Sequence, residues 1–249
     1  MRSSPSLNRR DRADVRGSAW VWGVHAVAAA LANPRRKIER VVATRNGLAR
    51  LPAHVRADVL EPAAIDALLP PDAVHQGVAL RAEPPEPLDL EEACLPPDGR
   101  AVVLLDGVTD PQNVGAVFRA AAAFGARAIV MQDRKSPALT GALAKASAGA
   151  IDVVPHVRAV NLARTVAALN EAGYVSIALE GGAAASLCNA LADGRAPVIV
   201  LGAEGAGVRD LVAASCDLRA RIPIAPAMES LNVAAAAAVA LYEVARAKG

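Results

Sequence analysis

The sequence is poor in aromatic residues, with two Trp, two Tyr and two Phe among its 249 residues. A platform that stacks several bases of single-stranded nucleic acid on aromatic side chains is therefore not expected as its main binding device. Cysteine is also scarce: Cys94, Cys188 and Cys216 are odd in number and lack C-x-x-C spacing, and the four histidines have no Cys or His partner at ligand spacing. This pattern predicts neither disulfides nor a metal site, and it indicates a reducing compartment.

The sequence also lacks an apolar run that could span a bilayer, because Val233–Tyr242 is far too short. The segment Ala19–Ala32 follows an Arg-rich stretch and superficially resembles a signal peptide. Asp11 and Asp14 in that stretch, and His25 in the middle of the apolar segment, argue against this interpretation. We therefore expect a soluble, cytoplasmic protein that does not bind a membrane.

The chain has no large excess of positive or negative charge, since 27 basic and 25 acidic side chains give a net charge of +2. The charges are nevertheless unevenly distributed: residues 1–50 carry a net charge of +8 and residues 51–99 a net charge of −8. The basic front end fits a polyanionic partner, and it fits a solvated arm equally well. With 53% hydrophobic residues, the chain has enough apolar material to bury a sizeable core.

Composition divides the chain into four segments. Residues 1–17 have no apolar periodicity and are expected to form a disordered basic arm. Residues 18–82 predict a small α/β domain, with helices near 24–32 and 62–69 and strands at 38–44 and 77–82. Residues 83–99 are rich in proline and acidic residues and predict a semi-rigid linker that packs neither as helix nor as sheet. Residues 100–249 form the larger, remaining domain.

In this larger domain, short β-branched runs alternate with helical stretches. Strands are expected at 102–106, 128–133, 174–179 and 198–201, and helices near 113–124, 138–148, 160–172, 207–214 and 230–247. Strict alternation predicts an α/β fold with a parallel sheet covered by helices on both faces. Sites in such folds lie beyond the carboxyl ends of strands, which here selects the loops Asp106–Asn113, Gly202–Gly207 and Ile222–Asn232.

The first loop leads into the helix near 113–124. Asp110 and Pro111 favour a turn, and Asn113 is placed either to cap or precede the helix or to act in a site. Arg119 lies off the apolar stripe, which recurs at i, i+3, i+4 and i+7 from Val114. On these residues alone, Arg119 is either a solvated charge or a functional cation.

The second loop is rich in glycine, since Gly202, Gly205 and Gly207 follow an apolar strand and Glu204 lies among them. The glycines fit either a tight turn or close approach of the backbone to a ligand. Their order is G-x-x-G-x-G, which fails the G-x-G-x-x-G spacing of dinucleotide-binding folds. A nicotinamide-dependent enzyme is therefore a weak alternative.

The third loop is stiffened by Pro223 and Pro226. Ser230 is predicted to start the helix near 230–247 as its N-cap, and Asn232 follows two residues later. The helix behind them is almost entirely alanine and valine, so it is either deeply buried or half of a subunit interface.

Together, D-x-x-x-D-P-x-N-x-G-x-x-x-R at 106–119, L-G-x-E-G-x-G at 201–207 and the I-P and S-L-N-V elements at 222–233 resemble the three signature motifs of SpoU-type, or SPOUT, RNA 2′-O-ribose methyltransferases. WGVHAVAAAL near 22–31 and VHQGVAL at 74–80 resemble the small ribosomal-protein-like RNA-binding domain of the subgroup that modifies a guanosine of 23S rRNA. The resemblance covers nearly everything after residue 18, whereas residues 1–17 have no counterpart.

This resemblance implies a C-terminal trefoil knot, an exception to the rule against knotted chains. It further implies that the knot binds S-adenosylmethionine and that the catalytic domain forms a homodimer. By motif match, the positions that bind the cofactor are Gly202, Ala203, Ile222 and Leu231. The catalytic positions by the same match are Asn113, Arg119, Glu204, Ser230 and Asn232.

The implied reaction transfers a methyl group to a ribose 2′-hydroxyl, with Arg119 as the principal residue. A guanidinium is a poor proton acceptor at neutral pH, so Arg119 acts either as a base loaded by the substrate phosphate or as a fixed cation.

Lys145 and Ser147, in a segment that also resembles the family, are weaker candidates for structural or phosphate-contacting roles. RNA binding is expected from a basic cluster in the small domain, formed by Arg35, Arg36, Lys37, Arg40 and Arg45.

Two alternatives to a 23S rRNA methyltransferase remain at this point. One is a tRNA ribose methyltransferase of the same superfamily, which the VHQGVAL-bearing front domain disfavours. The other is a ribosome-assembly factor that binds rRNA without catalysis, which the complete set of five catalytic positions disfavours.

Overall fold

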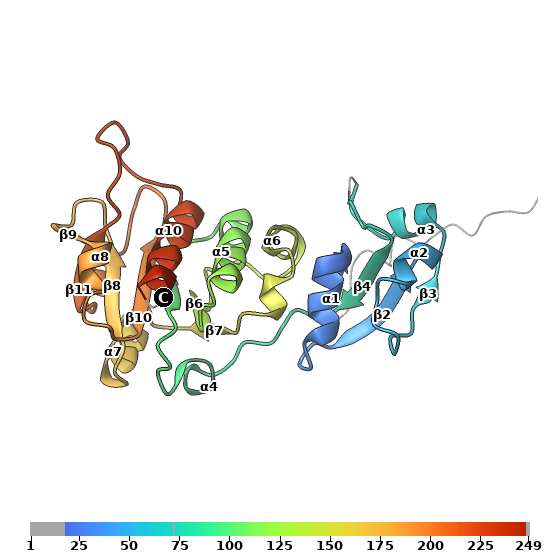
Figure 1. The fold of residues 1–249 in the computed structure, drawn as a ribbon, viewed down its shortest axis with the longest axis horizontal. Helices are drawn as coiled ribbons and strands as arrows, with labels where there is room; N and C mark the ends of the chain where they lie inside the picture. Colours follow the sequence, from blue (N-terminus) through green and yellow to red (C-terminus); the bar gives the residue numbers. More distant parts are fainter. Residues whose placement is uncertain (1–17, 72, 248–249) are drawn as a thin grey trace, which may run out of the picture.

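The computed structural model describes residues 18–71 and 73–247, and the arm expected at 1–17 lies outside the described residues. The described chain builds a small four-stranded sheet from residues 19–82 and a seven-stranded sheet from residues 102–221. Figure 1 shows these two units side by side along the long axis of the molecule.

The small sheet has strand order β1-β4-β2-β3. Its strands are β1 (Ala19–Trp22), β2 (Ile38–Ala43), β3 (Asp58–Val59) and β4 (Val78–Ala82), and its helices are α1 (Val24–Ala32), α2 (Arg45–Leu48) and α3 (Pro62–Asp66). The helices near 24–32 and 62–69 and the strands at 38–44 and 77–82 were expected, but β1 was not. Because side chains alternate along a strand, Val21 packs on one face with α1, whereas Trp20 and Trp22 pack on the other.

The large sheet has strand order β7-β6-β5-β10-β8-β11-β9, and every pair of neighbours is parallel. Its strands are β5 (Val102–Asp106), β6 (Ala128–Gln132), β7 (His156–Ala159), β8 (Val175–Leu179), β9 (Ala185–Ser186), β10 (Pro197–Gly202) and β11 (Leu218–Arg221). The predicted parallel α/β sheet is therefore confirmed. The strands β7, β9 and β11 were missed because they are short and carry polar side chains.

Helices cover both faces of the large sheet. One face packs against α5 (Pro111–Ala123), α6 (Gly141–Ser147), α8 (Leu187–Ala190) and α10 (Val233–Arg246) together with the 3₁₀ helix η2 (Ala150–Asp152). The other face packs against α4 (Leu90–Cys94), α7 (Leu162–Glu171) and α9 (Asp210–Ala214). The strands β5 and β6 are buried at every position, and they are apolar up to their last residues, Asp106 and Gln132, because each face of the sheet is covered.

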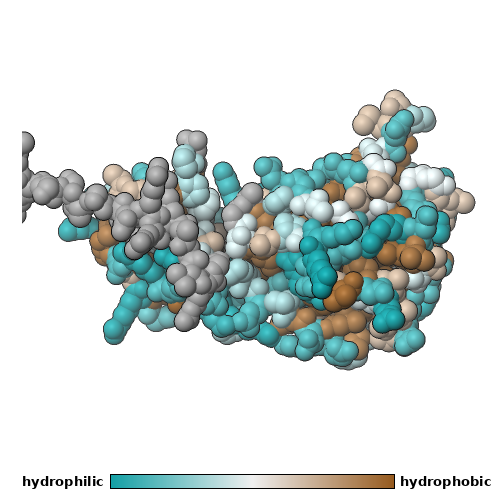
Figure 2. All heavy atoms as spheres, turned by 180° about the vertical axis from the view of Figure 1, so that it is seen from behind, coloured by the Kyte–Doolittle hydropathy of each residue, from teal (hydrophilic) through white to brown (hydrophobic). Residues whose placement is uncertain are grey.

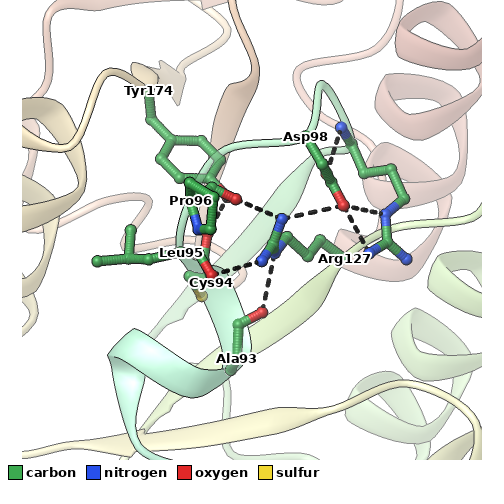
Figure 3. A network of polar contacts seen from close by, with 8 residues as sticks. Ala93, Cys94, Leu95, Pro96, Asp98, Arg127 and Tyr174 are labelled. Atoms are coloured by element: carbon green, nitrogen blue, oxygen red, sulfur yellow. Dashed lines mark hydrogen bonds and ion pairs between the residues drawn. The ribbon is translucent and has the colours of Figure 1, made fainter.

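The segment expected to be a linker without helix contains α4, so that part of the prediction was wrong. Prolines flank residues 88–95 but do not interrupt them, which leaves room for a short helix whose Ala93 and Cys94 are buried. The guanidinium of Arg127 donates to the carbonyl oxygens of Ala93 and Leu95 at 3.0 and 2.9 Å, as Figure 3 shows. The Tyr174 hydroxyl donates to the carbonyl oxygen of Cys94. These bonds fix the segment to the large sheet.

The two units meet between α1 and η2, which lie next to each other in Figure 1. Asn33 donates to Asp152 at 3.1 Å, and the buried guanidinium of Arg36 lies 3.3 Å from the same carboxylate oxygen. Burial lowers the pKa of Arg36 and raises the pKa of Asp152. Gly149 comes so close to α1 that a Cβ there would lie 3.0 Å from Ala26 Cα. The small unit is thus docked by direct packing.

After β11, the chain crosses to α10, which packs on α5 and β10 in the middle of the sheet. The connecting loop projects from the surface in both views (Figures 1 and 2), and residues 223–230 are exposed. Within the described residues, no helix combines the length and the apolar character needed to cross a membrane.

Candidate active site

A cavity of about 340 Å³ opens at the carboxyl ends of β8, β10 and β11. This is the edge of a parallel sheet at which ligands are expected to bind. Three loops supply its walls: residues 179–181 after β8, residues 201–205 and 207 around the end of β10, and residues 222, 224 and 229–231 after β11. Two of them are loops that the sequence selected, and the loop after β8 was missed because it carries no recognisable motif.

The glycine-rich turn after β10 folds back on itself. A Cβ at residue 202 would lie 1.9 Å from the carbonyl carbon of Gly207, so only glycine fits at this position. Gly207 donates its N–H to the carbonyl oxygen of Ala203 at 2.8 Å, and Gly205 and Gly207 have φ of 77° and 66°. The tight-turn interpretation of these glycines is therefore realised, and the turn exposes its backbone to the cavity.

Asn113, Glu204 and Asn232 meet at the rim of this cavity. Glu204 Oε1 accepts hydrogen bonds from Asn232 Nδ2 at 2.6 Å and from Asn113 Nδ2 at 3.2 Å. Asn232 Nδ2 also donates to Asn113 Oδ1 at 2.9 Å. The three residues come from α5, the glycine-rich turn and the start of α10. Glu204 lines the cavity, so it connects this polar cluster to the interior.

Both helix starts differ from the expectation. Asp110, not Asn113, caps α5, because its carboxylate accepts from the N–H groups of Gln112 and Asn113 at 3.1 and 3.3 Å. Asn232, not Ser230, caps α10, since its Oδ1 accepts from Ala234 N–H at 2.9 Å. The Asn113 side chain is thereby left for the polar cluster, and Ser230 remains in the loop that lines the cavity.

Comparison with known proteins fits this geometry. Residues 100–242 match the model of the SpoU rRNA Methylase family, and residues 20–88 match that of RNA 2′-O ribose methyltransferase substrate binding. The chain belongs to the SpoU rRNA methylase family.

Among its relatives, a 23S rRNA (guanosine-2′-O-)-methyltransferase RlmB of Vibrio cholerae is 36% identical over 240 residues, covering 91% of this chain and 96% of the relative. One from Burkholderia is 42% identical over 174 residues, covering 69% and 70%.

Solved structures share the fold of this SpoU methylase. The AviRb methyltransferase of Streptomyces viridochromogenes in complex with AdoMet superposes with a TM-score of 0.79 at 22% identity, covering 97% of this chain and 98% of AviRb. An AdoMet-bound rRNA methyltransferase from Sinorhizobium meliloti gives a TM-score of 0.78 at 25% identity, covering 93% and 88%.

The four residues expected to bind the cofactor of this SpoU methylase, Gly202, Ala203, Ile222 and Leu231, all line the cavity. Ser230 and Glu204 line it as well. The structure thus gathers two distant motifs of the sequence into one concave site. Leu179, Glu180 and Gly181 complete the wall and were not predicted.

Arg119 lies apart from this cavity in the single chain. It follows Asn113 by six residues on α5, which is about 9 Å along the helix axis. Its side chain is exposed, and it forms no hydrogen bond or ion pair within residues 18–71 and 73–247. One turn earlier, Gly115 packs so tightly on α6 that a Cβ there would lie 2.6 Å from the Leu143 carbonyl oxygen. Arg119 therefore lies one turn beyond the contact of α5 with α6, and it does not line the cavity wall.

The two weaker candidates on α6 differ in character. Ser147 is buried, and its hydroxyl donates to the Ala144 carbonyl oxygen at 2.9 Å, which is a contact within the helix. Lys145 is exposed, with no ion-pair partner in the described chain. Of the two, only Lys145 is available to a ligand.

The basic cluster expected to contact RNA is largely neutralised within the protein. Arg36 is buried against Asp152, so the expectation that it contacts phosphate was wrong. Arg35 pairs with Glu92, Lys37 with Glu83 and Glu86, and Arg40 with Asp58. Sequence reasoning missed this because the acidic partners lie up to 116 residues away along the chain, as Asp152 does from Arg36. Of the five, only Arg45 has no ion-pair partner in the part of the chain that the structure describes.

Exposed basic side chains do continue beyond Arg45. Arg50 and Arg56 follow it in the loop after α2, are exposed, and form no ion pair within the described residues. No acidic residue occurs between Arg40 and Asp58, which is the sequence signal that could have found this stretch. It is the better candidate for phosphate contacts in the small unit.

Proposed function

We propose that this protein transfers the methyl group of S-adenosylmethionine to the ribose 2′-hydroxyl of a guanosine in 23S rRNA. The observation that carries the proposal is the position of Glu204, which lines the cavity and also binds Asn113 and Asn232. One carboxylate therefore couples the cofactor side of the site to a polar cluster suited to a ribose. The RlmB relatives, which match over most of the chain, support the substrate.

The cavity fits the cofactor in size and chemistry. Its volume is within the range of small-molecule sites, and its walls combine apolar side chains with exposed backbone of the glycine-rich turn. Gly202, Ala203, Ile222 and Leu231 would hold the cofactor, with the carboxylate of Glu229 on the same wall as a counter-charge. When bound, S-adenosylmethionine supplies an electrophilic methyl group, and the protein has only to align it with the acceptor.

The polar cluster orients the acceptor ribose. Asn113 and Asn232 are held by Glu204 through charge-assisted hydrogen bonds, which fix their amide groups at the cavity rim. Ser230 lines the same rim and can donate to the sugar. Alignment of this kind can lower the barrier by roughly 7–11 kcal/mol.

Arg119 acts on the 2′-hydroxyl from the substrate side of α5. It serves either as the base that removes the hydroxyl proton once the substrate phosphate approaches it, or as a cation that stabilises the developing alkoxide while phosphate or water takes the proton. Arg119→Lys separates these roles, since lysine keeps the cation and loses a proton more readily than arginine does. A stabilising cation predicts partial activity that does not rise with pH, whereas a base predicts activity that rises as the lysine deprotonates.

The two units have separate tasks in this proposal. Residues 18–82 recognise RNA, residues 83–99 connect the units, and residues 100–249 catalyse within the cytoplasm. The crossing of the chain from β11 at the sheet edge to α10 at its middle supports a trefoil knot. Val239 and Tyr242 on α10 are exposed apolar side chains, which supports a homodimer packed on this helix.

The deciding experiment maps 2′-O-methyl groups on 23S rRNA from cells with and without this protein. One guanosine is expected to lose its methyl group when the protein is absent. Calorimetry with S-adenosylmethionine is run in parallel on the purified protein and on Arg119→Ala. The variant should keep cofactor binding and lose methyl transfer. Methylation of tRNA instead of rRNA, or failure to bind the cofactor, would overturn the proposal.

A further inference from the structure

Both tryptophans of the chain lie in one cleft outside the catalytic cavity. The cleft has a volume of about 290 Å³ and is bounded by β1, the loop before β4 and α6. Trp20, Trp22, His25 and Gln76 line it from the small unit, and Lys145 lines it from the large unit. Trp20 and Trp22 are only partly buried, so their indoles present apolar surface at a junction between the two units.

The cleft offers hydrogen-bonding groups beside its aromatic surface. Strand β1 is the outer strand of the small sheet, so the edge that faces α6 carries backbone groups without a strand partner in the described sheet. Gln76 adopts a left-handed backbone conformation with φ of 54°, and its Oε1 accepts from Val24 N–H at 2.9 Å. Its amide NH₂ group makes no bond within the described residues and is left as a donor.

Among the residues that the structure describes, those lining the cleft carry charge of one sign. Lys145 is exposed, none of the described lining residues is acidic, and His25 is an exposed imidazole. The catalytic cavity, by contrast, is lined by Glu180, Glu204 and Glu229. Apolar aromatic surface, edge hydrogen-bonding groups and a single cation together match the base and phosphate of a nucleotide.

The location of the cleft connects it to the reaction. Helix α6 contacts β1 on one side and packs against α5 on the other. Arg119 lies one turn beyond Gly115, the residue of α5 that touches α6. A helix is about 10 Å across, so the cleft is separated from the catalytic helix by the width of a single helix.

We propose that this cleft binds one unpaired nucleotide of the RNA substrate, adjacent along the strand to the nucleotide that is methylated. Its base lies against Trp20 and Trp22, and its phosphate is bound by Lys145. The inference rests on the proposed function, because it names where that RNA is held. Such a site needs few aromatic residues, because both indoles contact the base of a single nucleotide and no platform for several bases is required.

The two tryptophans make the cleft directly observable, because all indole emission of the chain originates there. The full-length protein is titrated with a 23S rRNA transcript, and tryptophan emission and filter-bound RNA are measured in the same samples. Binding is expected to quench the emission, and Trp20→Phe and Trp22→Phe should each remove part of the quenching. Both substitutions keep an aromatic ring, so that folding is preserved.

Lys145→Ala tests the phosphate contact. We expect the KM for RNA to rise about fivefold or more while kcat and the affinity for S-adenosylmethionine stay unchanged. The salt dependence of RNA binding should fall by about 0.7 in the log–log slope, as for one lost contact to a single strand. Arg164→Ala is the matched control and should change neither quantity, because it removes an exposed charge that has no ion-pair partner among the described residues, from α7 on the other face of the sheet.

The outcomes separate this inference from the proposed function. If RNA binds and is methylated while indole emission is unchanged, the cleft is not a nucleotide site, although the enzyme assignment stands. If Lys145→Ala changes the KM for RNA and the salt dependence no more than Arg164→Ala does, the phosphate contact is refuted, and the enzyme assignment again stands. If neither cofactor binding nor methyl transfer is found, both proposals fail together.

Discussion

Asp106 and Arg209, 103 residues apart in the sequence, form a doubly hydrogen-bonded ion pair at the carboxyl end of β5. Asp106 Oδ1 accepts from Arg209 Nε at 2.8 Å and lies 2.7 Å from Nη2, while Oδ2 accepts from the Arg209 backbone N–H at 2.8 Å. The carboxylate is buried, whereas the guanidinium is half exposed. The pair holds the end of the glycine-rich turn against the central strand, and so it positions Glu204 and the cavity wall.

Asp106→Asn is expected to lower the free energy of unfolding by about 1.5–3 kcal/mol, because the buried acceptor loses its charge. Affinity for S-adenosylmethionine should fall as well, since the turn that lines the cavity loses its anchor. Urea denaturation and calorimetry measure the two effects. Asp210→Asn changes the exposed acidic residue directly after Arg209 and should stay within about 0.5 kcal/mol of the unmodified protein. Equal stability and equal cofactor affinity in both variants would show that Asp106 does not anchor the glycine-rich turn.

Asn232 has two tasks that substitutions can separate, because Oδ1 caps α10 and Nδ2 donates to Glu204. Asn232→Ala removes both and should lower the free energy of unfolding by about 1 kcal/mol. Asn232→Asp keeps the capping oxygen but replaces the donor by a carboxylate oxygen that faces Glu204, so the cap is retained while repulsion between the two carboxylates disrupts the polar cluster. We expect methyl transfer to fall more than tenfold in both variants. Full activity of Asn232→Asp in a labelled-methyl assay would argue against the role of the amide in the site.

Arg127 holds the connecting segment by donating to three carbonyl oxygens, including that of Pro96 at 2.6 Å, and by pairing with Asp98 at 2.9 Å. Arg127→Ala should lower the free energy of unfolding by about 2 kcal/mol, because three carbonyl acceptors, two of them in partly buried hydrogen bonds, lose a charged donor. It should also speed proteolytic cleavage within residues 83–99. Arg100→Ala removes an exposed partner of the same Asp98 and is expected to change stability by less than about 1 kcal/mol. Similar protease resistance in both variants would show that Arg127 does not hold the connecting segment in place.

The buried pair Arg36–Asp152 connects the two units and leaves Arg36 Nε and Asp152 Oδ2 without hydrogen-bond partners within the described residues. Arg36→Met leaves the buried carboxylate of Asp152 without a positive partner and should lower the free energy of unfolding by about 3–5 kcal/mol. Adding Asp152→Asn removes that charge and keeps the oxygen that accepts from Asn33, so the double variant should recover most of the loss. A double-mutant cycle by urea denaturation measures this coupling, and strictly additive effects would contradict it.

His156 predicts a pH dependence of stability. Burial, and then the charge of Arg158, lowers its pKa to about 4 from the ordinary 6.5. Between these values the unfolded chain binds the proton and the folded chain does not, so stability falls as pH decreases from 6.5 to 4. The total loss is about 3 kcal/mol. His156→Phe should flatten this part of the profile, measured by thermal unfolding across pH. His54→Phe, at an exposed position, should leave the profile unchanged, and a flat profile in the unmodified protein would refute the assignment.

The sequence by itself determined the parallel sheet, the three loops and six of the residues that line the cavity, but not the loop after β8. These followed from local signals: apolar strands buried on both faces, turn residues after them, and motifs long enough to identify the family. Gly202, Ile222 and Leu231 could therefore be assigned to one binding site from their motifs alone, and all three line the cavity. The short helix α4 escaped prediction, because its proline-rich flanks outweighed the eight residues between them that contain no proline.

Only the tertiary structure decided how side chains far apart in the sequence are paired. The neutralisation of Lys37 by Glu86, the burial of Arg36 against Asp152 and the sharing of Glu204 by two asparagines all depend on which surfaces the fold brings together. The same holds for the cleft that unites Trp20 and Trp22 with Lys145. Charge and hydrogen bonding act over a few ångströms in space, and the sequence records only order along the chain.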